Sequence, residues 1–253
     1  MQTSSLEQHN TEIHLNQASW DGKPLLRSIY RDFYRRIADS ALPPSAGLVV
    51  ELGSGIGGIR DVLPHCIRTD IFENSHIDQV ENAYALSFEK QTVGTLILFD
   101  VFHHLQYPGA ALREFERVVV PGGRVIIFDP CVSLLGLVVY GAFHHEPLGL
   151  RTPISWNPPN GWNPDEHSYY AAQGNAYRVF FGSERHHISD AWEVVSRSRL
   201  SALSYVMSGG YSRPQMYPTS FYPVMRLVDR VLDGAPLLCA TRLMVVLQRA
   251  LSR

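Results

Sequence analysis

The first half of the chain alternates short apolar runs with polar turns. Residues 1–18 are polar and predict a loose tail, whereas residues 24–39 place apolar side chains at helical spacing. Five runs of strand length follow, the third of them less apolar, and they predict strands at 48–52, 66–72, about 76–82, 95–100 and 124–129. A helix is expected over residues 109–119. Strands that alternate with helices at this interval predict an α/β fold with a doubly wound parallel sheet.

The pattern changes after residue 130. Residues 130–189 are rich in Pro, Gly, Asn and aromatic side chains and form an insertion without a regular period. Irregular segments of this length in compact domains are usually functional or disordered, and the many aromatic residues argue against disorder. Order returns with a predicted helix at 190–198, strand at 203–207, helix at 222–232 and strand at 241–248. We expect residues 19–253 to form one domain whose sheet ends in a C-terminal antiparallel strand pair.

Composition narrows the class of protein. Of the 253 residues, 45% are hydrophobic and 18% are charged, which is ordinary globular composition. A net charge of −2 and a pI of about 6.6 argue against a nucleic-acid partner. The three distant cysteines indicate free thiols in a reducing compartment. Without a signal peptide, and with a longest apolar run (Val132–Phe143) too short to span a bilayer, the chain is expected to be cytoplasmic, without stable membrane insertion.

A glycine-rich run directly follows the first predicted strand: Glu51-Leu-Gly53-Ser-Gly55-Ile-Gly57-Gly58. Glycines at such a turn let the backbone bend tightly and approach a ligand without a clash at Cβ. Gly53, Gly55 and Gly58 also satisfy the G-x-G-x-x-G pattern of dinucleotide-binding proteins. The run by itself therefore predicts a nucleoside cofactor at this turn and does not say which one.

Three further features favour a methyltransferase over an oxidoreductase. Glu51 lies two residues before the first glycine, the turn Pro121-Gly122-Gly123 leads into an apolar strand, and the C-terminal elements fit an added antiparallel pair. With these features the chain resembles class I S-adenosylmethionine-dependent methyltransferases, particularly the bacterial small-molecule branch, over residues 47–130 and more loosely beyond. The resemblance implies a Rossmann-like sheet and methyl transfer from S-adenosylmethionine to a small-molecule acceptor, with a hydroxyl oxygen as the expected target.

The resemblance also implies which residues hold the cofactor. They are Glu51, Gly53, Ser54, Gly55, Gly57, Asp70, Ile71, Asn82, Ala83 and Asp100. Glu51 and the glycine loop would hold the methionine end, and Asp70 would accept hydrogen bonds from both ribose hydroxyls. Ile71 would pack on the adenine, and Asn82 would face its amino group, where the family usually carries an acidic residue. Carboxylates at several strand ends suit the sulfonium cation of this cofactor.

Histidines form three adjacent pairs, at 103–104, 144–145 and 186–187. Because adjacent side chains diverge in strands and helices, and no spacing matches a metal signature, no metal site is predicted. His103 or His104 is the predicted general base for an oxygen nucleophile, and packing near the site is the alternative interpretation.

The insertion is the predicted source of acceptor contacts. Ligands of open α/β sheets bind at the carboxyl ends of the strands, and the segment after the fifth strand can reach them. Its aromatic and basic side chains suit a sugar-like, aromatic or amphipathic molecule. The residues predicted to contact the acceptor are His144, His145, Tyr177 and Arg178. The alternative is that the aromatic residues form a satellite core under a long loop.

Two alternative functions stay open. A nicotinamide-dependent oxidoreductase would use the same glycines, but it often needs a Tyr-x-x-x-Lys pair, and the only lysines here are Lys23 and Lys90. A non-catalytic S-adenosylmethionine-binding protein would keep Glu51, Asp70 and Asp100 and lack turnover.

Overall fold

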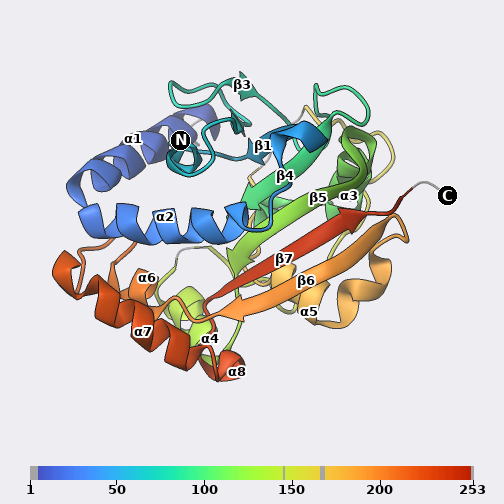
Figure 1. Cartoon of the computed structure of the whole chain (residues 1–253). Coiled ribbons are helices and arrows are strands. Elements are labelled where there is room, and N and C mark those ends of the chain that lie inside the picture. Colours follow the sequence, from blue (N-terminus) through green and yellow to red (C-terminus); the bar gives the residue numbers. More distant parts are fainter. Residues whose placement is uncertain (1–4, 145, 166–168, 252–253) are drawn as a thin grey trace.

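Seven strands form one sheet in the order β3-β2-β1-β4-β5-β7-β6 (Figure 1). The computed structural model describes residues 5–144, 146–165 and 169–251. The strands are β1 (Leu48–Leu52), β2 (Ile67–Asp70), β3 (Gln79–Val80), β4 (Val93–Phe99), β5 (Val119–Pro130), β6 (Trp192–Leu200) and β7 (Arg242–Arg249). The first five are parallel, and β7 is antiparallel to both β5 and β6. The predicted mostly parallel, Rossmann-like sheet with a C-terminal antiparallel pair is confirmed.

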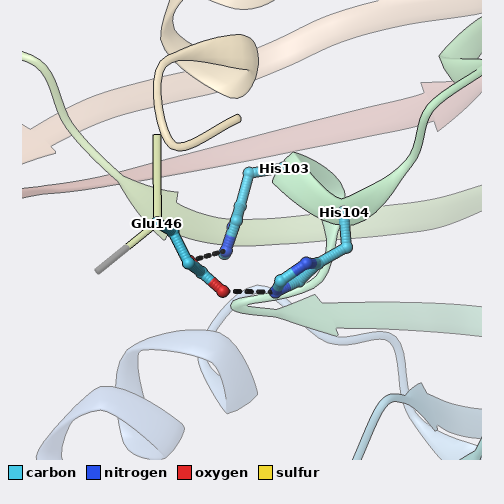
Figure 2. A group of neighbouring side chains, drawn as sticks. All are labelled: His103, His104 and Glu146. Atoms are coloured by element: carbon cyan, nitrogen blue, oxygen red, sulfur yellow. Dashed lines mark ion pairs between the residues drawn. The ribbon is translucent and has the colours of Figure 1, made fainter. Parts of the chain in front are cut away.

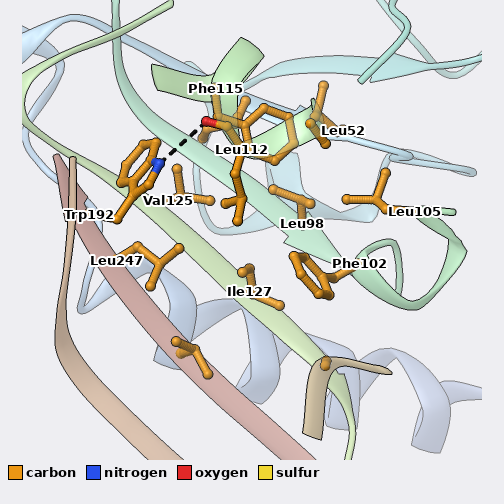
Figure 3. Close-up of a cluster of buried hydrophobic side chains, with 14 of the residues drawn as sticks. Leu52, Leu98, Phe102, Leu105, Leu112, Phe115, Val125, Ile127, Trp192 and Leu247 are labelled. Carbon is orange, nitrogen blue, oxygen red and sulfur yellow. Dashed lines mark hydrogen bonds between the residues drawn. The ribbon is translucent and has the colours of Figure 1, made fainter. Parts of the chain in front are cut away.

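Helices cover both faces of this sheet (Figure 1). They are α1 (Ser5–Gly22), α2 (Pro24–Ala38), α3 (Pro108–Val118), α4 (Leu134–Ala142), α5 (Asn175–Phe181), α6 (Leu203–Met207), α7 (Tyr222–Leu232) and α8 (Pro236–Cys239). One core cluster joins the sheet to α3 and α5 (Figure 3). The other joins it to α2 and to the aromatic residues around α6. Burying apolar surface on both faces is what makes the central strands continuously hydrophobic.

The predicted loose tail is wrong, because residues 5–22 form helix α1. The helix is polar over most of its length, so the sequence lacks the repeat of apolar residues from which a helix is predicted. Its anchors are Ile13, which is buried, and Trp20, whose ring lies 5.7 Å from the Tyr30 ring in an edge contact. Tertiary contact and not local propensity therefore fixes this helix.

Residues 53–92 contain no α-helix, and the structure describes all of them. The glycine-rich run leads only into a short 3-10 turn, η2 (Gly58–Asp61), before β2. A short 3-10 turn therefore stands where a helix was expected after the loop. What faces the loop is a neighbouring strand end and not the first turn of a long helix.

Two C-terminal assignments are also wrong. Residues 190–198 were expected to be helical and residues 203–207 extended, whereas 192–200 form the edge strand β6 and 203–207 form α6. A short apolar run suits a buried helix as well as a strand, and only the partners decide between them. The predicted helix at 222–232 and strand at 241–248 are confirmed as α7 and β7.

The insertion after β5 is more ordered than its composition suggests. It contains α4, α5 and the 3-10 turn η4 (Ser183–His187). Phe180 of α5 is fully buried, and its ring lies 5.0 Å from that of Phe102. Part of the insertion is therefore core. None of the described helices is both long enough and apolar enough to cross a membrane.

Candidate functional site

The glycine loop turns away from β1 with left-handed backbone angles. Gly53, Gly55 and Gly57 have φ values of 65°, 52° and 70°. A Cβ on Gly53 would overlap the side chain of Val101, and a Cβ on Gly57 would lie 2.7 Å from the carbonyl oxygen of His76. Both positions therefore require glycine for backbone conformation and for space.

Asp70 lies at the end of β2, beside this loop. Its Oδ2 accepts a hydrogen bond from the backbone N–H of Gly55 at 2.9 Å, and its Oδ1 accepts from that of Ile71 at 2.7 Å. The side chain is buried. The carboxyl ends of β1 and β2 thus meet where the sequence predicted a shared site, with a carboxylate held against the loop.

Glu51 is the buried carboxylate beneath the loop. It is 1% exposed, and its Oε2 has no hydrogen-bond partner among the described residues. Burial raises the pKa of Glu51 to about 7, although hydrogen bonds from Ser54 and Tyr34 oppose the rise. An unpartnered buried carboxylate oxygen fits the ammonium group at the methionine end of S-adenosylmethionine.

Helix α1 covers the loop, which the sequence did not predict. A Cβ on Gly55 would lie 3.9 Å from Cδ1 of Ile13, and one on Gly58 would lie 3.0 Å from the indole of Trp20. The segment expected to be a loose tail therefore shields the site from solvent on this side.

Asn82 has partners of its own in the structure. Its Oδ1 accepts from the backbone N–H of Tyr84 at 3.0 Å, and its Nδ2 donates to the carbonyl of Pro164 at 2.7 Å. Asn82 thereby joins the segment after β3 to the insertion. Ala83 and Ile71 are part-buried, and Ala83 packs against the α3–α5 core cluster.

Asp100 directly follows β4 in a strained backbone conformation, with φ of 56°. Its carboxylate forms an ion pair with Arg242, which lies at the start of β7. Arg242 is buried, and its guanidinium lies 4.6 Å from the centre of the Tyr205 ring. Sequence reasoning missed Arg242, because a lone arginine at a strand start carries no signal until its partner is known.

A cluster of histidine and carboxylate side chains lies beyond Asp100 (Figure 2). His103 Nδ1 lies 3.1 Å from Oδ2 of Asp129, and His104 Nδ1 lies 2.9 Å from the carbonyl oxygen of Tyr170. Glu146 comes from the insertion, with Oε2 3.5 Å from His103 Nε2 and Oε1 3.7 Å from His104 Nε2. Three segments distant in sequence meet here.

The two histidine rings do not diverge. Their centroids lie 4.1 Å apart, because both residues end the 3-10 turn η3 (Phe102–His104) and belong to neither an α-helix nor a strand. The argument that adjacent histidines must diverge is therefore wrong at this pair.

The charges of the cluster are strongly coupled. Burial alone would lower the pKa of His103, but Asp129 and Glu146 outweigh it and raise that pKa to about 10. Burial and the neighbouring His103 lower the pKa of His104. Burial opposes ionisation of Glu146, yet the two histidines hold its pKa well below the usual range. The cluster stabilises negative charge on Glu146.

The predicted acceptor residues divide into two groups. His144 belongs to the cluster, since its Nδ1 lies 3.8 Å from Oε2 of Glu146. Arg178 instead donates to the carbonyls of Gly149 and Thr152, within the insertion. Tyr177 stacks on Phe181 of the same helix, with ring centroids 5.8 Å apart. His145 lies outside the described residues.

Residues 50–127 match the model of a family described as a methyltransferase domain. No curated protein matches the chain. Among solved structures, a chain from the complex of the Haloferax volcanii Trm112 methyltransferase activator with a methyltransferase has a TM-score of 0.54 at 14% identity, covering 99% of both chains. An Archaeoglobus fulgidus SAM-dependent methyltransferase has a TM-score of 0.51 at 12% identity, covering 88% of this chain and 94% of that one. A Thermotoga maritima SAM-dependent methyltransferase, described as a possible histamine N-methyltransferase, also has 0.51 at 12% identity, over 94% and 99%.

The fold is that of SAM-dependent methyltransferases. The matched family segment contains the end of β1, the glycine loop, Asp70 and the turn that carries His103 and His104. The family and the shared fold support S-adenosylmethionine as the cofactor. The family match ends at residue 127, before the insertion.

Proposed function

We propose that this chain is an S-adenosylmethionine-dependent methyltransferase that methylates a hydroxyl oxygen of a small-molecule acceptor. The observation that carries the proposal is the buried, unpartnered Oε2 of Glu51 under a glycine loop that Asp70 braces from the next strand. A dinucleotide site needs no carboxylate beneath the loop, whereas a cofactor with a cationic amino-acid end does.

Three carboxylates would each bind a different part of the cofactor. Glu51 would pair with the ammonium group, and Asp70 would accept from the ribose hydroxyls while keeping the loop in place. Asp100, already paired with Arg242, would present its remaining lone pairs to the mouth of the site. Ile71, Asn82 and Ala83 would border the adenine. Oδ1 of Asn82 already accepts from the backbone N–H of Tyr84, and its second lone pair would accept from the adenine amino group.

The acceptor would bind at the ends of β4 and β5, beside the histidine cluster. S-Adenosylmethionine, when bound, supplies a methyl group on a cationic sulfur. The acceptor oxygen would attack the methyl carbon in line, the carbon–sulfur bond would break with its electron pair going to sulfur, and the hydroxyl proton would leave. Positioning supplies much of the rate because the methyl donor is already activated. We expect the residues after β4, His103 and His104, to promote loss of that proton.

The contacts of the insertion favour a small molecule as the acceptor. Its backbone bonds directly to the turn after β4, through Tyr170 to the His104 ring and through Ala172 to the carbonyl of His103. Pro164 holds Asn82 in the same way. A segment tied to the site at three points would restrict access to it, which supports a small molecule rather than a folded partner as the acceptor.

Calorimetry with S-adenosylhomocysteine and with NADH tests the cofactor. We expect S-adenosylhomocysteine to bind in the micromolar range, near −8 kcal/mol for about 1 μM. Binding of NADH alone would contradict the proposal. Transfer of labelled methyl groups to a panel of hydroxyl compounds tests the acceptor, and cofactor binding without turnover across a broad panel would favour a non-catalytic binding protein.

A further inference from the structure

The hydrogen bonds of the cluster determine which ring nitrogens carry protons. His103 Nδ1 faces a carboxylate oxygen of Asp129, and His104 Nδ1 faces the carbonyl oxygen of Tyr170. Both partners are acceptors only, so each Nδ1 must donate. Nε2 is therefore the nitrogen of each ring that would present a lone pair to a metal ion.

Both Nε2 atoms lie beside the same carboxylate, that of Glu146 (Figure 2). The distances are 3.5 Å from His103 Nε2 to Glu146 Oε2 and 3.7 Å from His104 Nε2 to Glu146 Oε1. The same atoms are the donors that transition-metal ions bind.

The spacing is that of a metal-binding site. The ligand atoms of His103, His104 and Glu146 all lie within 4.8 Å of one another. Ligands placed about 2.1 Å from a tetrahedral zinc ion are about 3.4 Å apart, close to the two distances given above. Small side-chain rotations would complete the coordination.

The surroundings hold these ligands in place. Glu146 accepts hydrogen bonds from the hydroxyl of Tyr169 and from Nε2 of Gln173. Gln173 is 1% exposed, and its Oε1 has no partner among the described residues although the side chain is directed into the cluster. Metal-binding histidines typically donate their second ring N–H to a carboxylate or a backbone carbonyl, as both histidines do here.

We propose that Nε2 of His103, Nε2 of His104 and the carboxylate of Glu146 bind one divalent transition-metal ion, with Zn²⁺ the best fit to the donor set. Two imidazoles and one carboxylate form a three-ligand site that leaves at least one coordination position open. His144 lies at the edge of the cluster, but its Nδ1 already accepts from the backbone N–H of Glu146, so we do not count it among the ligands.

The open position would receive the acceptor hydroxyl, and this step rests on the proposed function. A carboxylate oxygen of Asp100, which borders the proposed cofactor site, lies within 4.8 Å of a ring nitrogen of His103 and of a carboxylate oxygen of Asp129. An acceptor hydroxyl bound to the ion would have a lowered pKa, release its proton to solvent and attack as an alkoxide. The histidines would then act as ligands, in place of the general-base role that the sequence suggested.

The chain contains a matched control for this site. His186 and His187 are also adjacent, their rings lie 3.9 Å apart, and His187 Nε2 lies 3.7 Å from Oε2 of Glu184. Both of these histidines are exposed, and no third ligand converges on them among the described residues. Removing a histidine there tests whether two neighbouring imidazoles near a carboxylate suffice.

The experiment is metal titration of the full chain after removal of bound metal with a chelator. We expect one equivalent of Co²⁺ to give visible absorption bands of low coordination number, and Zn²⁺ to displace it. His104→Ala and Glu146→Gln should weaken Zn²⁺ binding by more than about 100-fold, and Asp129→Asn by about 10–100-fold. His187→Ala should bind as the unchanged protein does.

Binding of S-adenosylhomocysteine separates this proposal from the proposed function. His104→Ala and Glu146→Gln should keep that affinity, which also shows that they fold. Absence of saturable Co²⁺ and Zn²⁺ binding, or equal losses in His187→Ala and His104→Ala, would overturn the metal site while leaving cofactor binding intact. Metal binding without S-adenosylhomocysteine binding would instead overturn the methyltransferase proposal and keep the site. Should His104→Ala fail to fold, Glu146→Gln alone decides.

Discussion

The glycine loop and the histidine cluster lie at the same edge of the sheet but are assembled in opposite ways. The loop is one continuous stretch after β1, and its carboxylate partner, Asp70, ends the next strand along the chain. The cluster joins the turn after β4, Asp129 of β5 and Glu146 of the insertion. Local geometry builds the first, and long-range packing builds the second.

The difference shows in what each region requires of the rest of the protein. The loop needs left-handed glycines and a neighbouring strand, which any sheet of this topology provides. The cluster needs the insertion to fold back onto the sheet, and α5 anchors it there through Phe180. The acceptor side should therefore be more sensitive to changes made far from it.

The largest effect is expected at that anchor. Phe180→Ala removes a fully buried ring from its contact with Phe102 and should lower the free energy of unfolding by about 3–5 kcal/mol. Urea denaturation measures it, with the part-buried Tyr177→Ala as the control of smaller effect. A loss below about 1 kcal/mol would mean that α5 does not anchor the insertion.

Asp70→Asn tests the cofactor end. It keeps the size of the side chain but removes the charge that strengthens hydrogen bonds to ribose hydroxyls, worth roughly 1.5–3 kcal/mol. The affinity for S-adenosylhomocysteine should fall about tenfold or more, with the fold retained. Calorimetry measures the affinity, and an unchanged value would show that Asp70 only braces Gly55.

Glu51 should make cofactor binding depend on pH. Its pKa in the folded protein is about 7, above the ordinary value of 4.5. Between these values the folded state holds a proton that the unfolded chain has lost, so the stability of the free protein should fall as pH rises from about 4.5 to 7 and then level off. The cofactor ammonium favours the ionised form.

Affinity for S-adenosylhomocysteine should accordingly rise on the order of tenfold between pH 5.5 and 7.5. Glu51→Gln should remove both slopes, and calorimetry and denaturation at the two pH values measure them. A pH-dependent affinity that survives in Glu51→Gln would assign the titration to another group.

The smallest effect is expected at Arg178. Its guanidinium holds two backbone carbonyls of the insertion, so Arg178→Ala should raise the KM for the acceptor a few-fold, with kcat and S-adenosylhomocysteine affinity nearly unchanged. Arg185→Ala, an exposed arginine of η4, is the control. A large loss of kcat would place Arg178 in direct contact with the reacting groups.

The alternation of apolar runs was sufficient to predict the positions of most strands and the parallel arrangement of the first five. The failures have physical reasons. Helix α1 is polar and depends on Ile13 and Trp20, and the short run at 203–207 fits a helix or a strand equally well. The partner of Arg242 could not be predicted, because Asp100 follows β4 and is 142 residues away in the sequence.

The sequence by itself determined the cofactor loop, since glycine conformation, the following strand and the carboxylate at its end are local properties of a short stretch. It also determined that His103 and His104 follow β4. Only the tertiary structure decided that Glu146, Asp129 and the carbonyl of Tyr170 surround them. Spacing along the chain predicts a neighbour within one helix or strand, but contacts across a long insertion depend on how the whole core packs.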